Sequence, residues 1–211
     1  MDRKRALWPS SAGSRIERTG RRARRCKREE AVVERSDGDG AYVALLRAVN
    51  VGGHAKISME SLRSVFSRLG FGEVRTVIQS GNVVFTSDEP PEVDEIERAI
   101  ERRSGLAVAV LLRTSREFRE VCSTVPFDAV EPDSVHIGFL RDRVERDLLE
   151  SIDAARFAPE RAVALGREVY FSLPEGMGRA KLPQAVERKL ARPMTIRNRS
   201  SVDRLNALLH H

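Results

Sequence analysis

Cysteine is scarce in this sequence, with two residues among 211. Cys26 lies in a basic segment and Cys122 at the end of an apolar helical pattern, and neither has the spacing of a metal ligand. Cys122 is interpreted as a small buried apolar residue. The four histidines likewise include no pair with metal-ligand spacing, so we predict no metal site. Few thiols without a disulfide pattern favour a reducing compartment, and we expect a cytoplasmic protein.

Long hydrophobic runs are also missing. No run approaches the ~20 apolar residues that a membrane-spanning helix needs, and the longest, YVALL and AVAVLL, have the length of strands. The basic N-terminus has no apolar segment of the secretory type. Charged residues make up 32% and apolar residues 41% of the chain, which is typical of a soluble globular protein. We therefore predict no membrane association.

Signals of catalysis are weak. The chain has no G-x-S-x-G segment, which a nucleophile elbow would require. The segment from Gly176 to Lys181, GMGRAK, lacks the spacing of a phosphate loop and of a dinucleotide site. It stays a second candidate for anion binding, as a basic loop ahead of a helix. The sequence predicts no cofactor and leaves open whether the protein is an enzyme.

The net charge of +6 is unevenly distributed. Residues 1–40 hold 12 Lys/Arg and 7 Asp/Glu, a net of +5, whereas residues 41–211 hold 25 and 24, a net of +1. We expect residues 1–40 to be a disordered tail. It is interpreted as a nucleic-acid or acidic-partner arm, a passive extension, or the product of a start codon placed too early. The nearly neutral charge of the domain argues against nucleic-acid binding there and leaves it open for the tail.

The remainder of the chain reads as one order of elements used twice. In the first half, Ser58 is a natural helix N-cap and Gly70 a natural stop. The expected strands of this half are residues 41–47, 73–78, 82–86 and 107–113, with helices marked by apolar residues over 59–69, 93–100 and 118–122. The expected strands of the second half are residues 134–140, 161–165, 168–173 and 194–197, with helices over 148–152, 182–190 and 202–209.

Each half therefore has the order β-α-β-β-α-β-α. The first six elements of this order are those of the ferredoxin-like βαββαβ unit. We predict an α+β fold of two tandem ferredoxin-like subdomains, residues 41–127 and 134–211, packed together by duplication. In the second half, His136 is interpreted as a half-buried structural residue, and the turn from Arg197 to Arg199 as solvated, with Asn198 as a cap.

One long stretch resembles a known family. YVALLRAVNVGGHAKISMESLRSVFSRLGF followed by VRTVIQSGNVVF closely resembles the bacterial domain-of-unknown-function 1697 family, and the GREVYF and TIRN segments look like its later blocks. The resemblance covers residues 42–209. The chain departs from it at Ala48, where the family usually has glycine, at Ala180, and at Thr195-Ile196. It implies the duplicated ferredoxin-like fold and no particular activity.

The loop that follows the first strand is the best candidate site. It contains Asn50, Gly52, Gly53, His54 and Lys56 and leads into a helix N-terminus. Adjacent glycines allow backbone N–H groups to approach a ligand, and the helix dipole favours an anion there. We predict that a small anionic or phosphorylated ligand binds at this loop. A turn with an exposed histidine is the alternative.

Four further polar residues are included in this predicted site. Arg47 ends the first strand, and Gln79, Ser80 and Asn82 cluster at the first hairpin. The hairpin residues also suit a structural role, since polar side chains at turns satisfy backbone groups. A nucleic-acid-binding module and a protein-interaction module remain the alternative functions. For RNA binding on the sheet, the central strands offer Tyr42 and Phe85 without an aromatic-basic pattern. The oligomeric state is not predicted.

Overall fold

The structure is a computed structural model of the 211-residue chain. It describes residues 40–49, 56–77, 81–128, 130–145, 147, 149 and 151–209, and these belong to one compact unit. Residues 1–39, which hold the predicted tail, lie outside the described residues. Among the described residues, no helix combines the length and the apolar character needed to cross a membrane.

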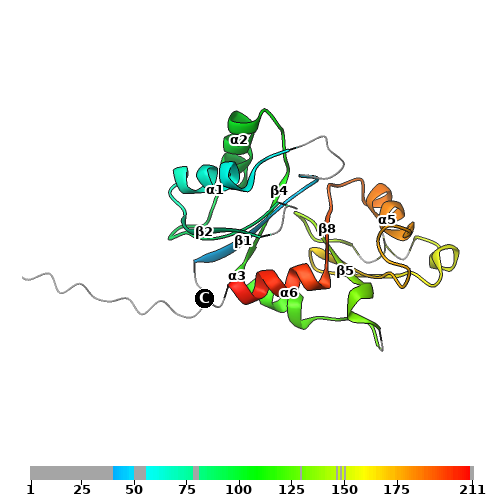
Figure 1. The fold of residues 1–211 in the computed structure, drawn as a ribbon. Helices are drawn as coiled ribbons and strands as arrows, with labels where there is room; N and C mark the ends of the chain where they lie inside the picture. Colours follow the sequence, from blue (N-terminus) through cyan, green and yellow to red (C-terminus); the bar gives the residue numbers. More distant parts are fainter. Residues whose placement is uncertain are drawn as a thin grey trace, which may run out of the picture. The chain divides into compact units, whose positions relative to one another are not determined.

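The first repeat forms a four-stranded antiparallel sheet with the strand order β2-β3-β1-β4 (Figure 1). This order and the split βαβ connections are those of a ferredoxin-like unit. Its elements are β1 (Ala41–Leu46), α1 (Met59–Arg68), β2 (Gly72–Val77), β3 (Asn82–Thr86), α2 (Val93–Ser104), β4 (Val110–Thr114) and α3 (Ser115–Ser123). β4 begins three residues later than predicted, because β1 ends at Leu46, which lies opposite Val110.

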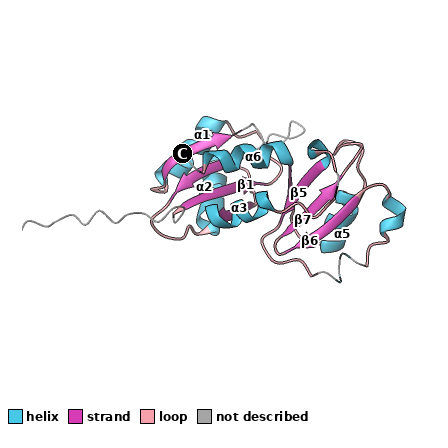
Figure 2. Ribbon diagram, turned by 90° about the horizontal axis from the view of Figure 1, so that it is seen from below, coloured by secondary structure: helices cyan, strands magenta, loops and turns pink. Residues whose placement is uncertain are grey.

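The second repeat forms a second antiparallel sheet with the equivalent order, β6-β7-β5-β8 (Figure 2). Its elements are η1 (Pro132–Ser134), β5 (Val135–Phe139), η2 (Ala154–Phe157), β6 (Arg161–Leu165), β7 (Glu168–Ser172), α5 (Leu182–Leu190), β8 (Thr195–Asn198) and α6 (Arg199–Leu208). The predicted helix between β5 and β6 includes Leu148, which lies outside the described residues, while Asp147 and Leu149 are helical. The duplicated α+β fold is confirmed, and the boundaries 41–127 and 134–211 stay a prediction.

Helix ends follow the predicted capping residues. The Ser58 hydroxyl accepts a hydrogen bond from the Ser61 N–H at 3.0 Å and begins α1. Asn198 does the same for α6, accepting from the Ser201 N–H at 3.1 Å. These side chains supply acceptors for N–H groups that have no partner within the helix.

Each sheet has one face covered by its own helices. Along β1, Ala44 and Leu46 face α1 and α2 and join a core with Phe66 and Ile96. The helices α1 and α2 lie together on this side of the sheet (Figure 1). The second repeat builds the same layer, in which Val186 of α5 packs in one core with the apolar residues of β7.

The opposite faces of the two sheets contribute to one shared core. Val43 and Leu45 alternate with the helix-facing residues of β1 and join a cluster that includes Ile137 of β5. The helices α3 and α6 contact each other and complete this cluster (Figure 1). The predicted packing of the two subdomains on each other is therefore observed as a common hydrophobic core.

The two sheets pair their strands in matching registers. Val43 lies opposite Arg113 in the first sheet, and Ile137 lies opposite Arg197 in the second. The pairs formed with the third strand of each repeat match in the same way. Residues at matching positions are therefore equivalent between the repeats. Four equivalent pairs follow from this match: Leu46 and Leu140, Arg47 and Arg141, Asn82 and Glu168, and Arg113 and Arg197.

Candidate functional site

The predicted site is described in part. Six of its nine residues lie outside the described residues: Asn50, Gly52, Gly53, His54, Gln79 and Ser80. The other three are Arg47, Lys56 and Asn82, and the structure places them in different surroundings. A ligand role stays a prediction for all nine.

Arg47 follows β1 and extends toward the second repeat. Its Nη2 lies 2.8 Å from Oε1 of Glu187 on α5, and 43% of its side chain is exposed. The next residue, Ala48, has a φ of 54°, in the left-handed region that favours glycine. This left-handed backbone at Ala48 turns the chain just after the end of β1.

Arg47 lines a surface pocket of about 470 Å³ together with residues of α5 and the segment after it. The lining residues are Arg47, Gln184, Glu187, Arg188, Ala191, Arg192 and Pro193. Three guanidinium groups therefore surround this pocket, against the carboxylate of Glu187. Nη1 of Arg192 donates to the carbonyl oxygen of Arg143 at 3.2 Å, which fixes one of the three. Guanidinium groups bind phosphate and carboxylate in a planar, two-bond geometry.

Lys56 and Asn82 have other environments. Lys56 is exposed just ahead of α1 and is not among the residues that line this pocket. Asn82 is fully buried. Its Nδ2 donates to the Val77 carbonyl oxygen at 3.1 Å, and its Oδ1 accepts from Nε of Arg197 at 2.6 Å. These contacts agree with the structural interpretation of the hairpin, in which a polar side chain satisfies a backbone group.

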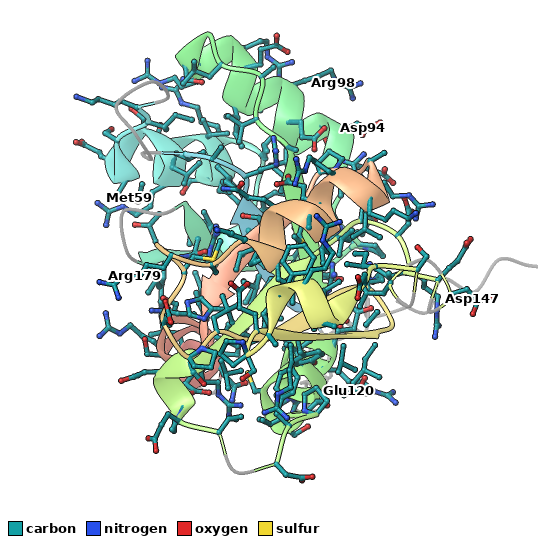
Figure 3. All side chains as sticks on the ribbon, turned by 90° about the vertical axis from the view of Figure 1, so that its right-hand side faces the viewer. Met59, Asp94, Arg98, Glu120, Asp147 and Arg179 are labelled. Atoms are coloured by element: carbon teal, nitrogen blue, oxygen red, sulfur yellow. The ribbon has the colours of Figure 1, made fainter. Side chains whose placement is uncertain are left out.

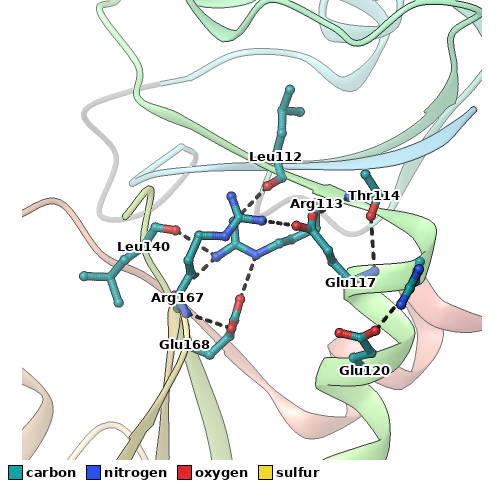
Figure 4. A network of polar contacts seen from close by, with 9 residues as sticks. Leu112, Arg113, Thr114, Glu117, Glu120, Leu140, Arg167 and Glu168 are labelled. Carbon is teal, nitrogen blue, oxygen red and sulfur yellow. Dashed lines mark hydrogen bonds and ion pairs between the residues drawn. The ribbon is translucent and has the colours of Figure 1, made fainter. Parts of the chain in front are cut away.

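A buried arginine that the sequence analysis did not single out lies between the repeats. Arg113 of β4 is 1% exposed, and its Nε donates to Oε1 of Glu168 at 2.7 Å (Figure 4). Its Nη2 donates to the Leu140 carbonyl oxygen at 2.8 Å and its Nη1 to that of Leu112 at 2.8 Å. Burial lowers the pKa of the Arg113 guanidinium, and the Glu168 carboxylate opposes this shift.

A second pocket, of about 460 Å³, opens beside this network. Its lining residues are Arg113, Glu117, Glu120, Val121, Thr124, Arg143, Leu165, Gly166, Arg167, Glu168 and Tyr170. Three arginines here meet three glutamates, and Arg167 donates to Oε1 of Glu117 at 2.6 Å (Figure 4). The charges of this lining balance, so it should attract an anion less strongly than the pocket that Arg47 lines.

The burial of Arg197, the equivalent of Arg113, shows that one prediction from the sequence is wrong. The turn from Arg197 to Arg199 was expected to be solvated, but Arg197 is 8% exposed. Its Nη2 donates to the Leu46 carbonyl oxygen at 2.9 Å, and burial lowers its pKa to about 10. Both arginines directly precede a helix N-cap, Thr114 or Asn198. The sequence signal that could have predicted the burial of these residues is an arginine near the end of the fourth strand in each repeat, directly before a helix N-cap.

The second anion candidate, the loop from Gly176 to Lys181, leads to a helix start that already carries a carboxylate. Glu160 accepts hydrogen bonds from the backbone N–H of Lys181 at 3.1 Å and of Leu182 at 2.8 Å. Arg179 of this loop extends away from the ribbon (Figure 3). The backbone N–H groups of Lys181 and Leu182, at the start of α5, are thus engaged within the chain.

Cys122 is buried as predicted, whereas His136, expected to be half-buried, is buried. Cys122 is 7% exposed in the shared core, and burial raises the pKa of its thiol to about 12. His136 is buried on β5, and its Nδ1 lies 3.2 Å from the carbonyl oxygen of Ser134. Among the described residues, no group of three or more His, Cys, Asp and Glu is arranged to hold a metal ion.

Comparison with known proteins gives a fold and a family. A solved structure of conserved bacterial protein SP0830 from Streptococcus pneumoniae has a TM-score of 0.62, with 21% sequence identity, and the match covers 82% of this chain and 99% of that one. At this identity the likeness shows the fold alone. No curated protein matches the sequence. The model of the family described as "Protein of unknown function (DUF1697)" matches residues 40–170. The chain therefore belongs to the DUF1697 family.

Proposed function

We propose that this protein binds a small anionic ligand, such as a phosphorylated metabolite, at the pocket beside Arg47. The observation that carries the proposal is the excess of guanidinium groups in this pocket, three against one carboxylate. Arg47 lies three residues before Asn50, at the β1 end of the predicted loop that contains Gly52 and Gly53. The glycine-containing loop in the sequence and the arginine-lined pocket in the structure are independent observations, and both indicate a site at the same end of β1.

Comparison of the two repeats supports this choice of pocket. Arg141, the equivalent of Arg47, forms ion pairs with Glu97 at 2.6 Å and with Asp94 at 3.8 Å on α2. Among the described residues, Arg47 instead pairs with the single carboxylate of Glu187, and the pocket lining adds Arg188 and Arg192. The same strand end therefore has acidic surroundings in one repeat and basic surroundings in the other. An anion is attracted to the basic one.

The energies allow a ligand to compete with the internal ion pair. The Arg47 and Glu187 side chains are 43% and 36% exposed, so their pairing contributes about 0–1 kcal/mol. A phosphate that engages Arg47 together with Arg188 or Arg192 exchanges one exposed charge contact for two, so the loss of the Glu187 contact does not prevent binding.

Several features favour a small ligand over RNA. The faces by which ferredoxin-like sheets bind RNA carry aromatics on the two central strands. Here the face opposite the helices contributes Val43, Leu45 and Val84 to the shared core. Tyr42 and Phe85 stack with ring centroids 5.7 Å apart within the cluster on the helix-covered side. The bases of an RNA therefore have no open aromatic face on this sheet.

A ligand screen on the full chain tests the proposal. The melting temperature is measured with a panel of phosphorylated metabolites and nucleotides, and with pyrophosphate as a simple probe. We expect at least one of these anions to raise the melting temperature. Arg47→Ala should weaken its binding by roughly 10- to 100-fold, as expected for one lost charged hydrogen bond. The matched control is Arg141→Ala, which removes the equivalent exposed arginine.

Isothermal titration calorimetry of wild type, Arg47→Ala, Arg192→Ala and Arg141→Ala then assigns the site. The proposal requires loss of affinity in the first two variants and wild-type affinity in the third. Equal losses in Arg47→Ala and Arg141→Ala would assign the effect to general charge or stability. The absence of any anion-dependent shift in wild type would refute the proposal.

A further inference from the structure

The interface between the repeats is reciprocal at its centre. Nη2 of Arg113 donates to the Leu140 carbonyl oxygen at 2.8 Å, and Nη2 of Arg197 donates to the Leu46 carbonyl oxygen at 2.9 Å. Leu46 and Leu140 are equivalent, as are the two arginines. Each repeat therefore gives a guanidinium to the end of the other's first strand and receives one at the same place.

Two further bonds of each arginine follow the same rule. Nε of Arg113 donates to Glu168 Oε1 at 2.7 Å, and Nε of Arg197 donates to Asn82 Oδ1 at 2.6 Å. Glu168 and Asn82 are the first residues of β7 and β3, which are equivalent strands. Each arginine also donates through Nη1 to the carbonyl oxygen of the residue before it, at 2.8 and 2.9 Å.

Two exposed ion pairs extend the reciprocity outward. Arg47, which follows β1, reaches Glu187 on α5 at 2.8 Å. Its equivalent, Arg141, which follows β5, reaches Glu97 on α2 at 2.6 Å. The helices α2 and α5 both precede the fourth strand of their repeat. Contacts that are each made twice, in exchanged roles, are the property of an isologous interface between identical subunits.

We propose that this face fits a second copy of the chain, and that two chains form a dimer by exchanging their second repeats. In such a dimer the first repeat of each chain pairs with the second repeat of the other. Both interfaces then contain the contacts of the monomer, including the buried pair of Arg113 and Glu168. The chain passes between the repeats once, after α3 ends at Ser123 and before η1 begins at Pro132, so this segment alone changes its path.

Concentration decides between the two forms. A short connection holds the two repeats of one chain at an effective concentration on the order of mM. The monomer therefore dominates at micromolar concentrations, and exchange requires unfolding and refolding of the chains together at high concentration. Because both forms contain the same contacts, a single weakening substitution does not favour the dimer, whereas two complementary variants that each disfavour pairing within their own chain do favour a mixed dimer.

The first experiment uses wild-type chains that carry two different affinity tags. They are unfolded in urea and refolded together at about 0.5 mM, near the effective concentration given above. We expect a dimer on size-exclusion chromatography with light scattering that is retained on both affinity resins. Chains refolded separately and then mixed should give no doubly tagged dimer. Absence of a doubly tagged dimer after joint refolding would overturn the proposal.

The second experiment uses charge reversal to identify the interface. Arg113→Glu places two glutamates together within one chain, and Glu168→Arg places two arginines together. When the two variants are refolded as an equimolar mixture, exchange restores one native pair and one reversed pair. We expect the mixed dimer to form at micromolar concentration, where wild-type chains stay monomeric, because the tethered pairing is lost in both variants.

The double variant Arg113→Glu with Glu168→Arg is the control. If it folds as a monomer, the reversed pair is compatible with the interface, and failure of the mixture to form dimers would contradict the assigned face. If it does not fold, the reversed pair is not tolerated, and the joint refolding of wild-type chains decides the proposal.

Discussion

Glu168 allows a graded test of how the buried interface is stabilised. Its carboxylate is the charged partner of Arg113, whose side chain is 1% exposed while that of Glu168 is 11% exposed. Glu168→Ala leaves the guanidinium buried without this partner, which costs about 3–5 kcal/mol. Glu168→Gln keeps an amide oxygen at the same place. Asn82 shows that such an oxygen accepts from the equivalent arginine, at 2.6 Å.

The two substitutions are therefore expected to differ. We predict that Glu168→Gln costs about 1–2 kcal/mol, since the hydrogen bond from Arg113 is kept while the charge and the 3.2 Å hydrogen bond from the Arg167 N–H to the other carboxylate oxygen are lost. Glu168→Ala should lower the melting temperature by about 10 °C, because 1 kcal/mol corresponds to about 2–4 °C in a protein of this size. Urea unfolding gives both free energies, with unchanged slopes showing that the denatured state is the same.

Two results would refute this reasoning. Equal losses in Glu168→Gln and Glu168→Ala would mean that the charge, rather than the oxygen acceptor, satisfies Arg113. A loss below about 1 kcal/mol in Glu168→Ala would mean that the pair behaves like an exposed ion pair, which the burial of Arg113 opposes.

Three smaller predictions concern single sites. Ala48→Gly relieves a left-handed conformation that costs about 1–2 kcal/mol. Glycine also raises the entropy of the unfolded chain, which lowers stability by about 0.4–1 kcal/mol. Urea unfolding should therefore show a net gain in stability of about 0.5–1 kcal/mol, and Gly105→Ala, at φ 72° in open space, should lose a similar amount of stability. Cys122, whose raised pKa keeps the thiol protonated at pH 8, should resist a thiol reagent in a Cys26→Ser background until the protein unfolds, and rapid reaction in native buffer would contradict its burial. Asn198→Ala removes the N-cap of α6 and should cost about 1 kcal/mol in urea unfolding, whereas no change would mean that the cap hydrogen bond to Ser201 contributes nothing.

Local patterns in the sequence predicted the elements of the fold. The strands Asn82–Thr86 and Arg161–Leu165 have the predicted bounds, and Ser58 is the predicted N-cap. These features depend on neighbouring residues, which alternation and capping rules describe. The strand order also followed, because the ferredoxin-like arrangement goes with the order of elements.

Long-range contacts were harder to predict. Arg47 was included in the predicted site, but Arg188 and Arg192 were not, since helix-surface arginines resemble any solvated side chain. Their pocket joins segments about 140 residues apart, as the Arg47 to Glu187 contact shows. Arg197 was misjudged for a related reason, since its burial depends on how one repeat packs on the other.

The shared core has a consequence for synthesis of the protein on the ribosome. Residues from α6, such as Val202 and Leu205, complete the core that begins with Val43 and Leu45 of β1. The first repeat is translated well before α6, and at 5–20 residues per second the delay is roughly 5–15 s. During this interval the apolar face of the first sheet is covered by α3 of its own repeat but not yet by α6. The nascent chain is therefore expected to need a general chaperone that shields this face until the last helix leaves the ribosome.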